Sequence, residues 1–137
     1  MSTLNRRAVI AAGAALPLAG TLTACGSDGE SSESVATPEV EKGALIGAAA
    51  DVPVGGCAVF RDPKVVITQP SKGEFKAFSA VCTHQGCLVS SSKDGEIPCT
   101  CHGSAFSLTD GAVLKGPANE PLAPVEIVVD GADVRAV

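Results

Sequence analysis

Two short segments hold most of the metal-binding side chains of this sequence. The first reads CTHQGC, from Cys82 to Cys87, and the second reads CTCHGS, from Cys99 to Ser104. Together they contain both histidines of the chain and four of its six cysteines. Thiolate and imidazole groups are common ligands of zinc and of iron–sulfur clusters. The two segments therefore predict a metal centre that is built from both of them.

Ligand chemistry alone leaves more than one metal open. Two cysteines and two histidines suit a tetrahedral zinc site, but zinc leaves the other two cysteines of the segments without a role. A four-cysteine iron–sulfur cluster uses every thiol in the segments and leaves both histidines idle. The types of ligand therefore do not choose between zinc and a cluster.

The paired segments resemble the C-x-H-x-G-C and C-x-C-H-G-S motifs of the Rieske iron–sulfur domain. The resemblance covers residues 43–137, and it implies a Rieske-type [2Fe–2S] cluster as the cofactor. The roles that it assigns are one iron for Cys82 and Cys99, the other iron for His84 and His102, and a disulfide for Cys87 and Cys101.

The resemblance also gives roles to residues that follow the motifs. Gly116, Pro117 and Ala118 look like the proline-containing loop that covers the cluster from a third side. Ser104 keeps a hydroxyl that donates to a bridging sulfide in the family. Phe106 departs from the pattern, because high-potential members carry a tyrosine there. We therefore expect a potential below the top of the Rieske range.

The charge of such a cluster indicates its function. Two iron(III) ions, two sulfides and two thiolates sum to zero, whereas four thiolates would leave a dianion. A neutral cluster takes up an electron more easily, and Rieske centres lie at about −150 to +300 mV against about −400 mV for plant-type ferredoxins. The resemblance therefore implies one-electron transfer between protein partners.

The elements that position the two segments are expected to be strands. Short apolar runs alternate with Gly, Pro, Asp and Ser from residue 43 onward, and no window shows sustained helical periodicity. Three Asp-Gly pairs between such runs predict hairpins. The expected strands are 58–60, 65–69, 75–79, 88–91, 96–98, 105–108, 112–114, 125–129 and 134–137.

The fold class that follows is all-β. In the stretch VEIVVD, the alternation predicts that Val125, Ile127 and Val129 share one half-buried face. With the resemblance added, we expect a small antiparallel sandwich or barrel of Rieske type. Its cluster-binding subdomain would be formed by the two loops.

The N-terminal residues are typical of a bacterial export signal. Arg6 and Arg7 precede an apolar run, residues 8–22, that is too short for a comfortable membrane span. The adjacent arginines resemble a twin-arginine signal, and an ordinary Sec signal is the alternative. The letters LTAC, ending at Cys25, resemble a lipobox, whose cysteine receives a diacylglycerol. We therefore expect residues 1–24 to be removed.

The organisation of the mature chain follows from its composition. Residues 25–42 are polar and predict a disordered tether, and residues 43–137 form the Rieske domain. Without residues 1–24 the chain carries 8 basic and 15 acidic side chains, which disfavours a nucleic-acid partner, and we expect no nucleotide partner. The expected location is extracytoplasmic, lipid-anchored to the cytoplasmic membrane.

Three functions are compatible with this sequence. The first is a lipid-anchored carrier of single electrons between protein redox partners. The second is the electron-transfer subunit of a separately encoded exported oxidoreductase, a plan that resembles the small subunits of molybdenum oxidases such as arsenite oxidase. The third is a structural zinc-binding module. We identify no catalytic residues. The remaining cysteine, Cys57, is interpreted as a small buried strand residue, with a reactive thiol or an intermolecular disulfide as the alternatives.

Overall fold

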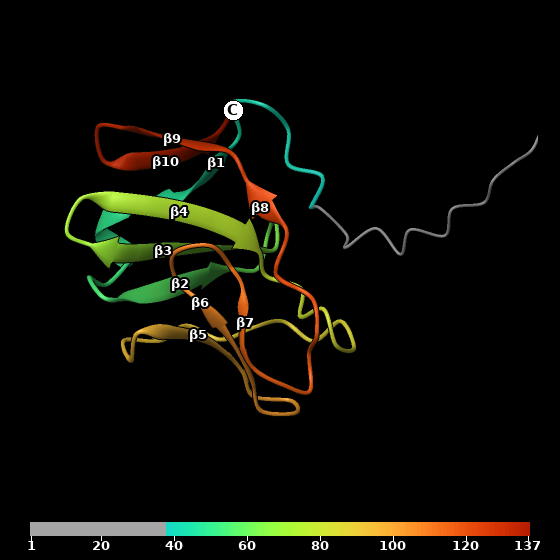
Figure 1. Ribbon diagram of the computed structural model, residues 1–137. Helices are drawn as coiled ribbons and strands as arrows, with labels where there is room; N and C mark the ends of the chain where they lie inside the picture. Colours follow the sequence, from blue (N-terminus) through green and yellow to red (C-terminus); the bar gives the residue numbers. More distant parts are fainter. Residues whose placement is uncertain (1–37) are drawn as a thin grey trace, which may run out of the picture. The chain divides into compact units, whose positions relative to one another are not determined.

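The computed structural model describes residues 38–137, and its fold is all-β, as the sequence predicts (Figure 1). Short strands and a single turn of 3-10 helix, η1, make up the described elements. In chain order these are β1 Leu45–Ala48, η1 Ala49–Asp51, β2 Gly56–Phe60, β3 Val65–Ser71, β4 Glu74–Ser79, β5 Glu96–Cys99, β6 Ser104–Ser107, β7 Val113–Lys115, β8 Pro124–Val125, β9 Ile127–Asp130 and β10 Asp133–Ala136.

The strands form three antiparallel sheets. Their orders are β1–β10–β9, which we call the basal sheet, β2–β3–β4–β8, and β5–β6–β7. Figure 1 shows the four-stranded sheet in the middle, with the basal sheet at one end and β5–β6–β7 at the other. We refer to residues 82–87 as box 1 and to residues 99–104 as box 2. Box 2 is the turn between β5 and β6, so it lies at the end of the domain away from the basal sheet.

Strand β3 separates two hydrophobic cores. Neighbouring side chains of a strand point to opposite faces, so Val66 joins one core while Val65 and Ile67 join the other; all three are fully buried. The site core consists of Cys57, Val66, Phe78, Ala80, Cys82, Val89, Ile97, Cys99, Phe106, Leu108, Ala118 and Leu122. The basal core consists of Ile46, Val52, Val65, Ile67, Ala77, Val134 and Ala136.

The presence or absence of a strand differs from the sequence prediction at two places. The expected strand 88–91 is absent, because Val89 donates to the Ala80 carbonyl while Ser90 donates to the Pro98 carbonyl. Its backbone is shared between two neighbours, and only one isolated bridge joins it to residue 81. Strand β1 was not predicted, because its sequence LIGA has one β-branched residue. It pairs with β10 through a bulge at Gly47, where a side chain would overlap the ring of Phe60.

The single strand predicted at 125–129 is two strands in different sheets. Val125 pairs with β4, the chain breaks at Glu126, and β9 then pairs with β10. Val125 and Ile127 pack on the basal core as expected. Val129 was expected on the same buried face and is 40% exposed, because β9 is an edge strand.

Two of the three Asp-Gly pairs form the predicted hairpins. Residues 130–131 connect β9 to β10, and residues 110–111 lie between β6 and β7. The third pair, at 94–95, does not join two paired strands. Just before it, Ser92 forms a bridge with Cys57 of β2, and β5 begins just after it. This turn therefore passes the chain from one sheet to another.

The expected export signal lies outside the described residues. The signal 1–24, with Arg6 and Arg7, and the lipidation site Cys25 all fall there, as does most of the tether 25–42. In the described part of the tether, Val40 already packs against the basal core. No helix in residues 38–137 has the length and apolar character needed to cross a membrane.

Candidate metal centre

Box 1 is a tight turn that closes on its own cysteines. The N–H of Cys82 donates to the carbonyl of Cys87 at 2.7 Å, and the N–H of Gly86 donates to the carbonyl of Cys82 at 2.9 Å. Val81 and Leu88 extend the pairing as an antiparallel bridge. The turn therefore holds the side chains of residues 82–85 between two paired ends.

Box 2 repeats this geometry. The N–H of Gly103 donates to the carbonyl of Cys99 at 3.0 Å, and Cys99 pairs with Ser104 across the β5–β6 hairpin. Gly86 and Gly103 have φ angles of +76° and +83°, a region that other residues rarely adopt. Each box therefore has a glycine four residues after its first cysteine because the backbone adopts a positive φ angle there.

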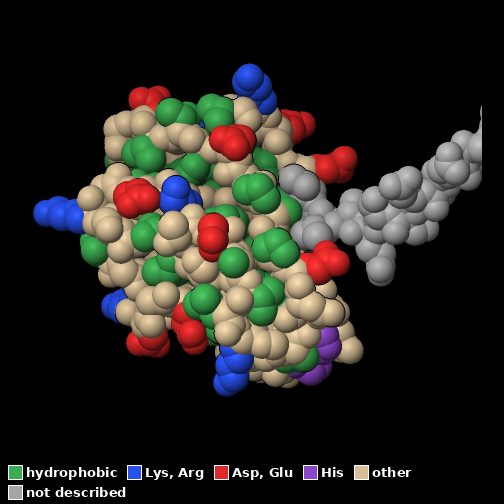
Figure 2. Space-filling model, in the orientation of Figure 1, with side chains coloured by type: hydrophobic (Ala, Val, Ile, Leu, Met, Phe, Trp, Pro, Cys, Tyr) green, Lys and Arg blue, Asp and Glu red, His purple; other side chains and the backbone are tan. Residues whose placement is uncertain are grey.

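The two histidines face each other across the boxes. Their Nδ1 atoms lie 3.2 Å apart, and the rings are nearly perpendicular, at 80°. His102 is exposed and His84 is half-buried. Figure 2 shows the histidine surface at the lower edge of the domain, away from most of the acidic side chains. Both imidazoles thus present a ring nitrogen to the same small region at one end of the molecule.

The first cysteine of each box lies behind the histidines in the site core. Cys82 and Cys99 are 2% and 1% exposed. Burial raises the pKa of the Cys82 thiol, and the neighbouring Cys99 raises it further, whereas the N–H groups of His84 and Gln85 oppose the shift. A buried thiol that resists ionisation needs a cation to stabilise its thiolate. The pair is therefore suited to a metal that displaces both protons.

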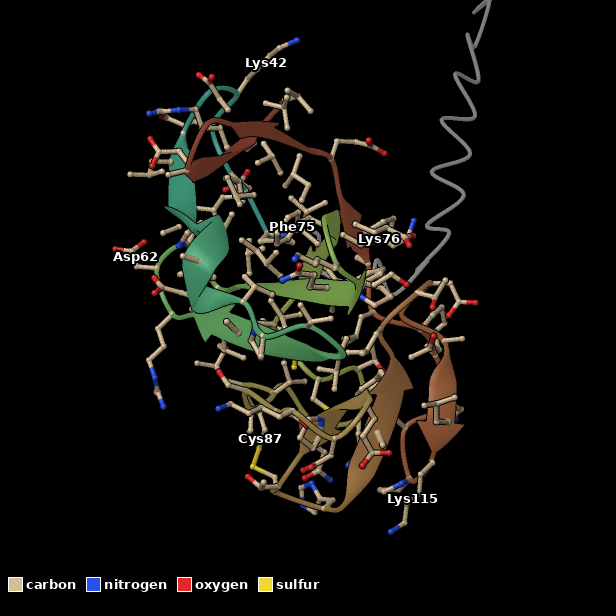
Figure 3. All side chains as sticks on the ribbon, turned by 90° about the vertical axis from the view of Figure 1, so that its left-hand side faces the viewer. Lys42, Asp62, Phe75, Lys76, Cys87 and Lys115 are labelled. Atoms are coloured by element: carbon tan, nitrogen blue, oxygen red, sulfur yellow. A yellow bond between two sulfur atoms is a disulfide. The ribbon has the colours of Figure 1, made fainter. Side chains whose placement is uncertain are left out.

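The remaining cysteines of the boxes form a disulfide. Cys87 and Cys101 are joined with their Cα atoms 6.5 Å apart, and Figure 3 shows the yellow disulfide bond beside Cys87. The bond connects the end of box 1 to the middle of box 2. It therefore clamps the two turns together without using the sulfurs of Cys82 or Cys99.

A third segment, residues 115–122, is tied to each box by one hydroxyl group. The N–H of Ala118 donates to Ser104 Oγ at 3.0 Å, and Thr83 Oγ1 donates to the carbonyl of Glu120 at 2.7 Å. Ala118 is 4% exposed and belongs to the site core, whereas Gly116 and Pro117 are exposed. The segment predicted to cover the centre therefore does lie against both boxes. The contact of Thr83 was not predicted, because its partner is 37 residues away.

The two expected tuning residues are both buried. Ser104 is 2% exposed, and because its oxygen accepts from Ala118, its hydroxyl proton is free to be donated elsewhere. Phe106 is fully buried in the site core with Cys99, and it pairs with Ile97 on β5. A ring at this position contributes packing and no hydrogen bond.

Cys57 belongs to the site core but to neither box. It is fully buried on β2, and its Sγ lies 3.5 Å from the Ser90 carbonyl oxygen and 3.8 Å from that of Glu96. Burial raises the pKa of its thiol to about 11, against a weaker opposing hydrogen bond from Ser92. It therefore behaves as a small buried strand residue, which is the first interpretation of the sequence.

The donor set fits a binuclear cluster. The four candidate ligands form like pairs, thiol with thiol and imidazole with imidazole, and each pair can serve one iron of a [2Fe–2S] centre. In residues 38–137 no group of three or more His, Cys, Asp or Glu side chains is placed to hold a single metal ion.

Comparison with known proteins identifies the family. A family profile described as the Rieske [2Fe-2S] domain matches residues 42–126. The chain belongs to this family. Rieske domains bind a Rieske-type [2Fe–2S] cluster and transfer electrons through it, and this assigns the cofactor of the boxes. The zinc alternative is therefore set aside.

Relatives of this Rieske chain include subunits of redox complexes. The cytochrome b6-f complex iron-sulfur subunit of Chlorobaculum thiosulfatiphilum is 37% identical over 89 residues, which is 63% of this chain and 48% of that protein. A putative respiratory nitrate reductase subunit Rieske of Haloferax mediterranei is 46% identical over 56 residues, 40% of this chain and 26% of that protein. The chain thus spans about half or less of the length of these relatives.

Solved structures agree with the Rieske fold. The plasma membrane Rieske protein PetC3 of Synechocystis PCC 6803 superposes with a TM-score of 0.56 at 31% identity, over 69% of this chain and 98% of that one. The ferredoxin of carbazole 1,9a-dioxygenase from Nocardioides aromaticivorans IC177 gives a TM-score of 0.57 at 20% identity, over 71% and 98%. The second likeness concerns the fold alone.

Proposed function

We propose that this Rieske protein is a carrier of single electrons on the outer face of the cytoplasmic membrane, anchored by a lipid on Cys25. One observation carries the redox part of the proposal. Two histidines with Nδ1 atoms 3.2 Å apart stand at the exposed end of the domain, in front of two buried thiols.

Each ligand has a distinct role in the proposal. Cys82 and Cys99 would hold one iron as thiolates, and His84 and His102 would hold the other through Nδ1. When bound, a [2Fe–2S] cluster accepts and donates one electron at a time. Because Nδ1 of each imidazole is engaged, Nε2 is the position where the ring carries or releases a proton. The site core keeps water away from the thiolates, and the hydroxyls of Thr83 and Ser104 hold the third segment in place.

The surroundings of the histidines suit brief encounters with protein partners. The two boxes contain no Asp, Glu, Lys or Arg, and the third segment, 115–122, adds only Lys115 and Glu120. A surface with little charge is desolvated at low cost when another protein docks on it. An electron donor and an electron acceptor can therefore use the same end of the domain in turn.

Loading and electron transfer are tested on purified protein. We expect about two irons and two sulfides per chain, the visible absorption of a Rieske centre, and a one-electron redox titration. His102→Ala should lose the cluster, while the control Cys57→Ala should keep it, because Cys57 lies in neither box and its Sγ lies beside the backbone carbonyls of Ser90 and Glu96. A colourless wild-type protein that binds one zinc would refute the proposal.

The membrane location is tested by fractionation of cells. Wild-type chain should sediment with membranes and be released by detergent and not by salt. Cys25→Ser should give precursor or soluble protein, because the anchor is a diacylated cysteine and two acyl chains suffice for stable anchoring. Arg6→Lys combined with Arg7→Lys should block export through the twin-arginine route. Wild-type protein that is wholly soluble would contradict the anchor.

A second candidate function is that of an electron-transfer subunit of an exported oxidoreductase encoded separately. The observation that favours it is the likeness to the Rieske-type subunit of a putative respiratory nitrate reductase. Solubilisation in mild detergent separates the two candidates. A subunit should co-migrate in constant ratio with a larger chain that has oxidoreductase activity, whereas a free carrier should migrate without it.

A further inference from the structure

We propose that the outer face of the basal sheet and a groove beside it form a docking surface for a partner protein that presents lysine or arginine on an apolar surface. The inference rests on the proposed function only in assuming a protein partner. This surface lies at the opposite end of the domain from β5–β6–β7 and so leaves the histidines free (Figure 1).

The outer face of the basal sheet has an apolar row. Leu45 of β1, Arg135 of β10 and Val128 of β9 are direct cross-strand partners, so their side chains share one face. Leu45 is 53% exposed and Val128 is 45% exposed, and Val137, which follows two residues after Arg135, is 52% exposed. Large apolar side chains gathered on one face of a small domain indicate an interaction site.

The one basic group in this row is already occupied. Arg135 Nη2 contacts Asp133 Oδ2 at 3.0 Å, and Nη1 donates to the carbonyl of Gly43 at 3.4 Å. Asp130, directly opposite Asp133, has no ion-pair partner among the described residues. The face therefore offers apolar area and unneutralised acid, and no free base.

A groove of about 340 Å³ continues this face at the edge of β1. Leu45 belongs to both, and the groove walls combine apolar side chains with three carboxylates; the lining residues are Glu39, Val40, Glu41, Ala44, Leu45, Asp62 and Pro63. No basic residue lines it. The nearby Lys42 points away from the domain in Figure 3, and Asp62 lies at the side of the domain. An aliphatic stem with a cationic end, as in lysine or arginine, matches such a groove.

The negative charge of the groove favours a basic partner protein over the other molecules that could cover this surface. A second copy of the chain would bring the same carboxylates against one another, and anionic lipid headgroups would be repelled for the same reason. Residues 25–37 of the chain itself carry three acids and no base, so they have the same sign as the groove. A partner chain with a basic, partly apolar surface is the complementary match.

The test uses membranes from cells that express the full chain, solubilised in mild detergent and separated by native electrophoresis. We expect the wild type to migrate in an assembly heavier than the isolated chain. Glu41→Lys and Val128→Lys should each lower the assembled fraction about tenfold, because each places a cation against the basic surface of the partner. Asp94→Lys, a reversal of equal size at an exposed site near β5, should leave the assembly unchanged.

Four results would overturn the proposal. They are wild type that migrates as the isolated chain, equal loss in Asp94→Lys, a dimer of purified chain that Val128→Glu dissociates, and binding to phosphatidylglycerol vesicles that Val128→Glu abolishes. The absorption of each variant is recorded in parallel. Loss of the assembly in a variant that keeps its cluster supports docking. A wild type without a cluster refutes the proposed redox function, and the electrophoresis still decides whether the basal surface docks a partner.

Discussion

Ser104 Oγ accepts a hydrogen bond from the backbone N–H of Ala118 at 3.0 Å, and both residues are almost completely buried. The bond joins the first residue of β6 to the third segment, which is expected to cover the centre. It also occupies the hydroxyl oxygen, which leaves the hydroxyl proton as the only part of the side chain that can bond to the cofactor. One side chain thus has two separable roles, one in stability and one in redox potential.

Ser104→Ala should therefore lower both quantities. The unpaired N–H of Ala118 should cost about 1–3 kcal/mol of unfolding free energy. A hydrogen bond that strengthens by about 1–1.5 kcal/mol on reduction corresponds to roughly 40–65 mV, because about 1.4 kcal/mol and 59 mV both correspond to a factor of ten. We expect the potential to fall by tens of millivolts in a redox titration. Ser107 lies on the same strand as Ser104, and its Oγ accepts an exposed bond from the N–H of Thr109 in the following turn. Ser107→Ala should change neither quantity by a comparable amount. An unchanged potential with the cluster intact would show that the hydroxyl proton is directed elsewhere.

Thr83→Val should loosen the covering segment from box 1. The change removes the bond to the Glu120 carbonyl with little change of shape. Loss of a bond of about 0.5–1.5 kcal/mol raises the population of the open segment roughly 2- to 12-fold. Hydrogen exchange of the backbone N–H groups of Asn119 and Glu120 should accelerate by that factor. Thr100→Val, at an exposed threonine of box 2, is the control and should not accelerate it.

The sequence predicts the metal ligands of the centre better than it predicts the hydrogen bonds that hold the surrounding segments in place. The four candidate ligands lie within two short stretches, so their residue types and spacing can be recognised from the local sequence. The bonds from Thr83 to Glu120 and from Ala118 to Ser104 join residues far apart in the chain, and their geometry depends on the complete fold. Alternation along a strand is equally local, and it could not show that the chain leaves one sheet for another at Glu126.

Removal of the disulfide by combined Cys87→Ser and Cys101→Ser should destabilise the domain. A loop of about 15 residues contributes roughly 3 kcal/mol by restricting the unfolded chain, within an expected range of about 2–4 kcal/mol. The denaturant midpoint of the double variant should fall, and a reductant should lower the midpoint of the wild type to a similar value. The double variant should not respond to reductant. A wild-type midpoint that is insensitive to reductant would contradict the predicted contribution.

Phe106→Tyr should raise the reduction potential by tens of millivolts. The new hydroxyl would enter the site core, where Cys99 is also buried, and a hydroxyl that donates to a thiolate stabilises the reduced form more than the oxidised form. Phe106→Leu repacks the same position without a donor and serves as the control. A redox titration of the three proteins measures the effect. If the tyrosine variant kept its cluster and its potential did not rise, the assignment of Phe106 to the tyrosine position of the family would be wrong.

Because of Cys57, the free energy of unfolding should decrease in alkaline solution. Its pKa is raised from 9.0 to about 11 in the folded protein, because burial disfavours the thiolate. Above pH 9 the unfolded chain releases this proton and the folded chain does not. The contribution is therefore complete below about pH 9 and is lost as the pH rises to about 11. Free energies of unfolding measured against pH should fall less steeply for Cys57→Ala across that window.

The alternating side chains of β3 divide the molecule in a way that bears on how its sequence can change. Val66 supports the redox end, and Val65 and Ile67 support the basal end. Strand β4 alternates in the same way, so the two cores meet across the four-stranded sheet. Substitutions that repack Ile46 or Val134 can accumulate without moving the cysteines, and the basal surface can diverge to suit a new assembly while the redox end is retained. During evolution, the protein partner of the basal end could therefore change more readily than the redox reaction at the opposite end.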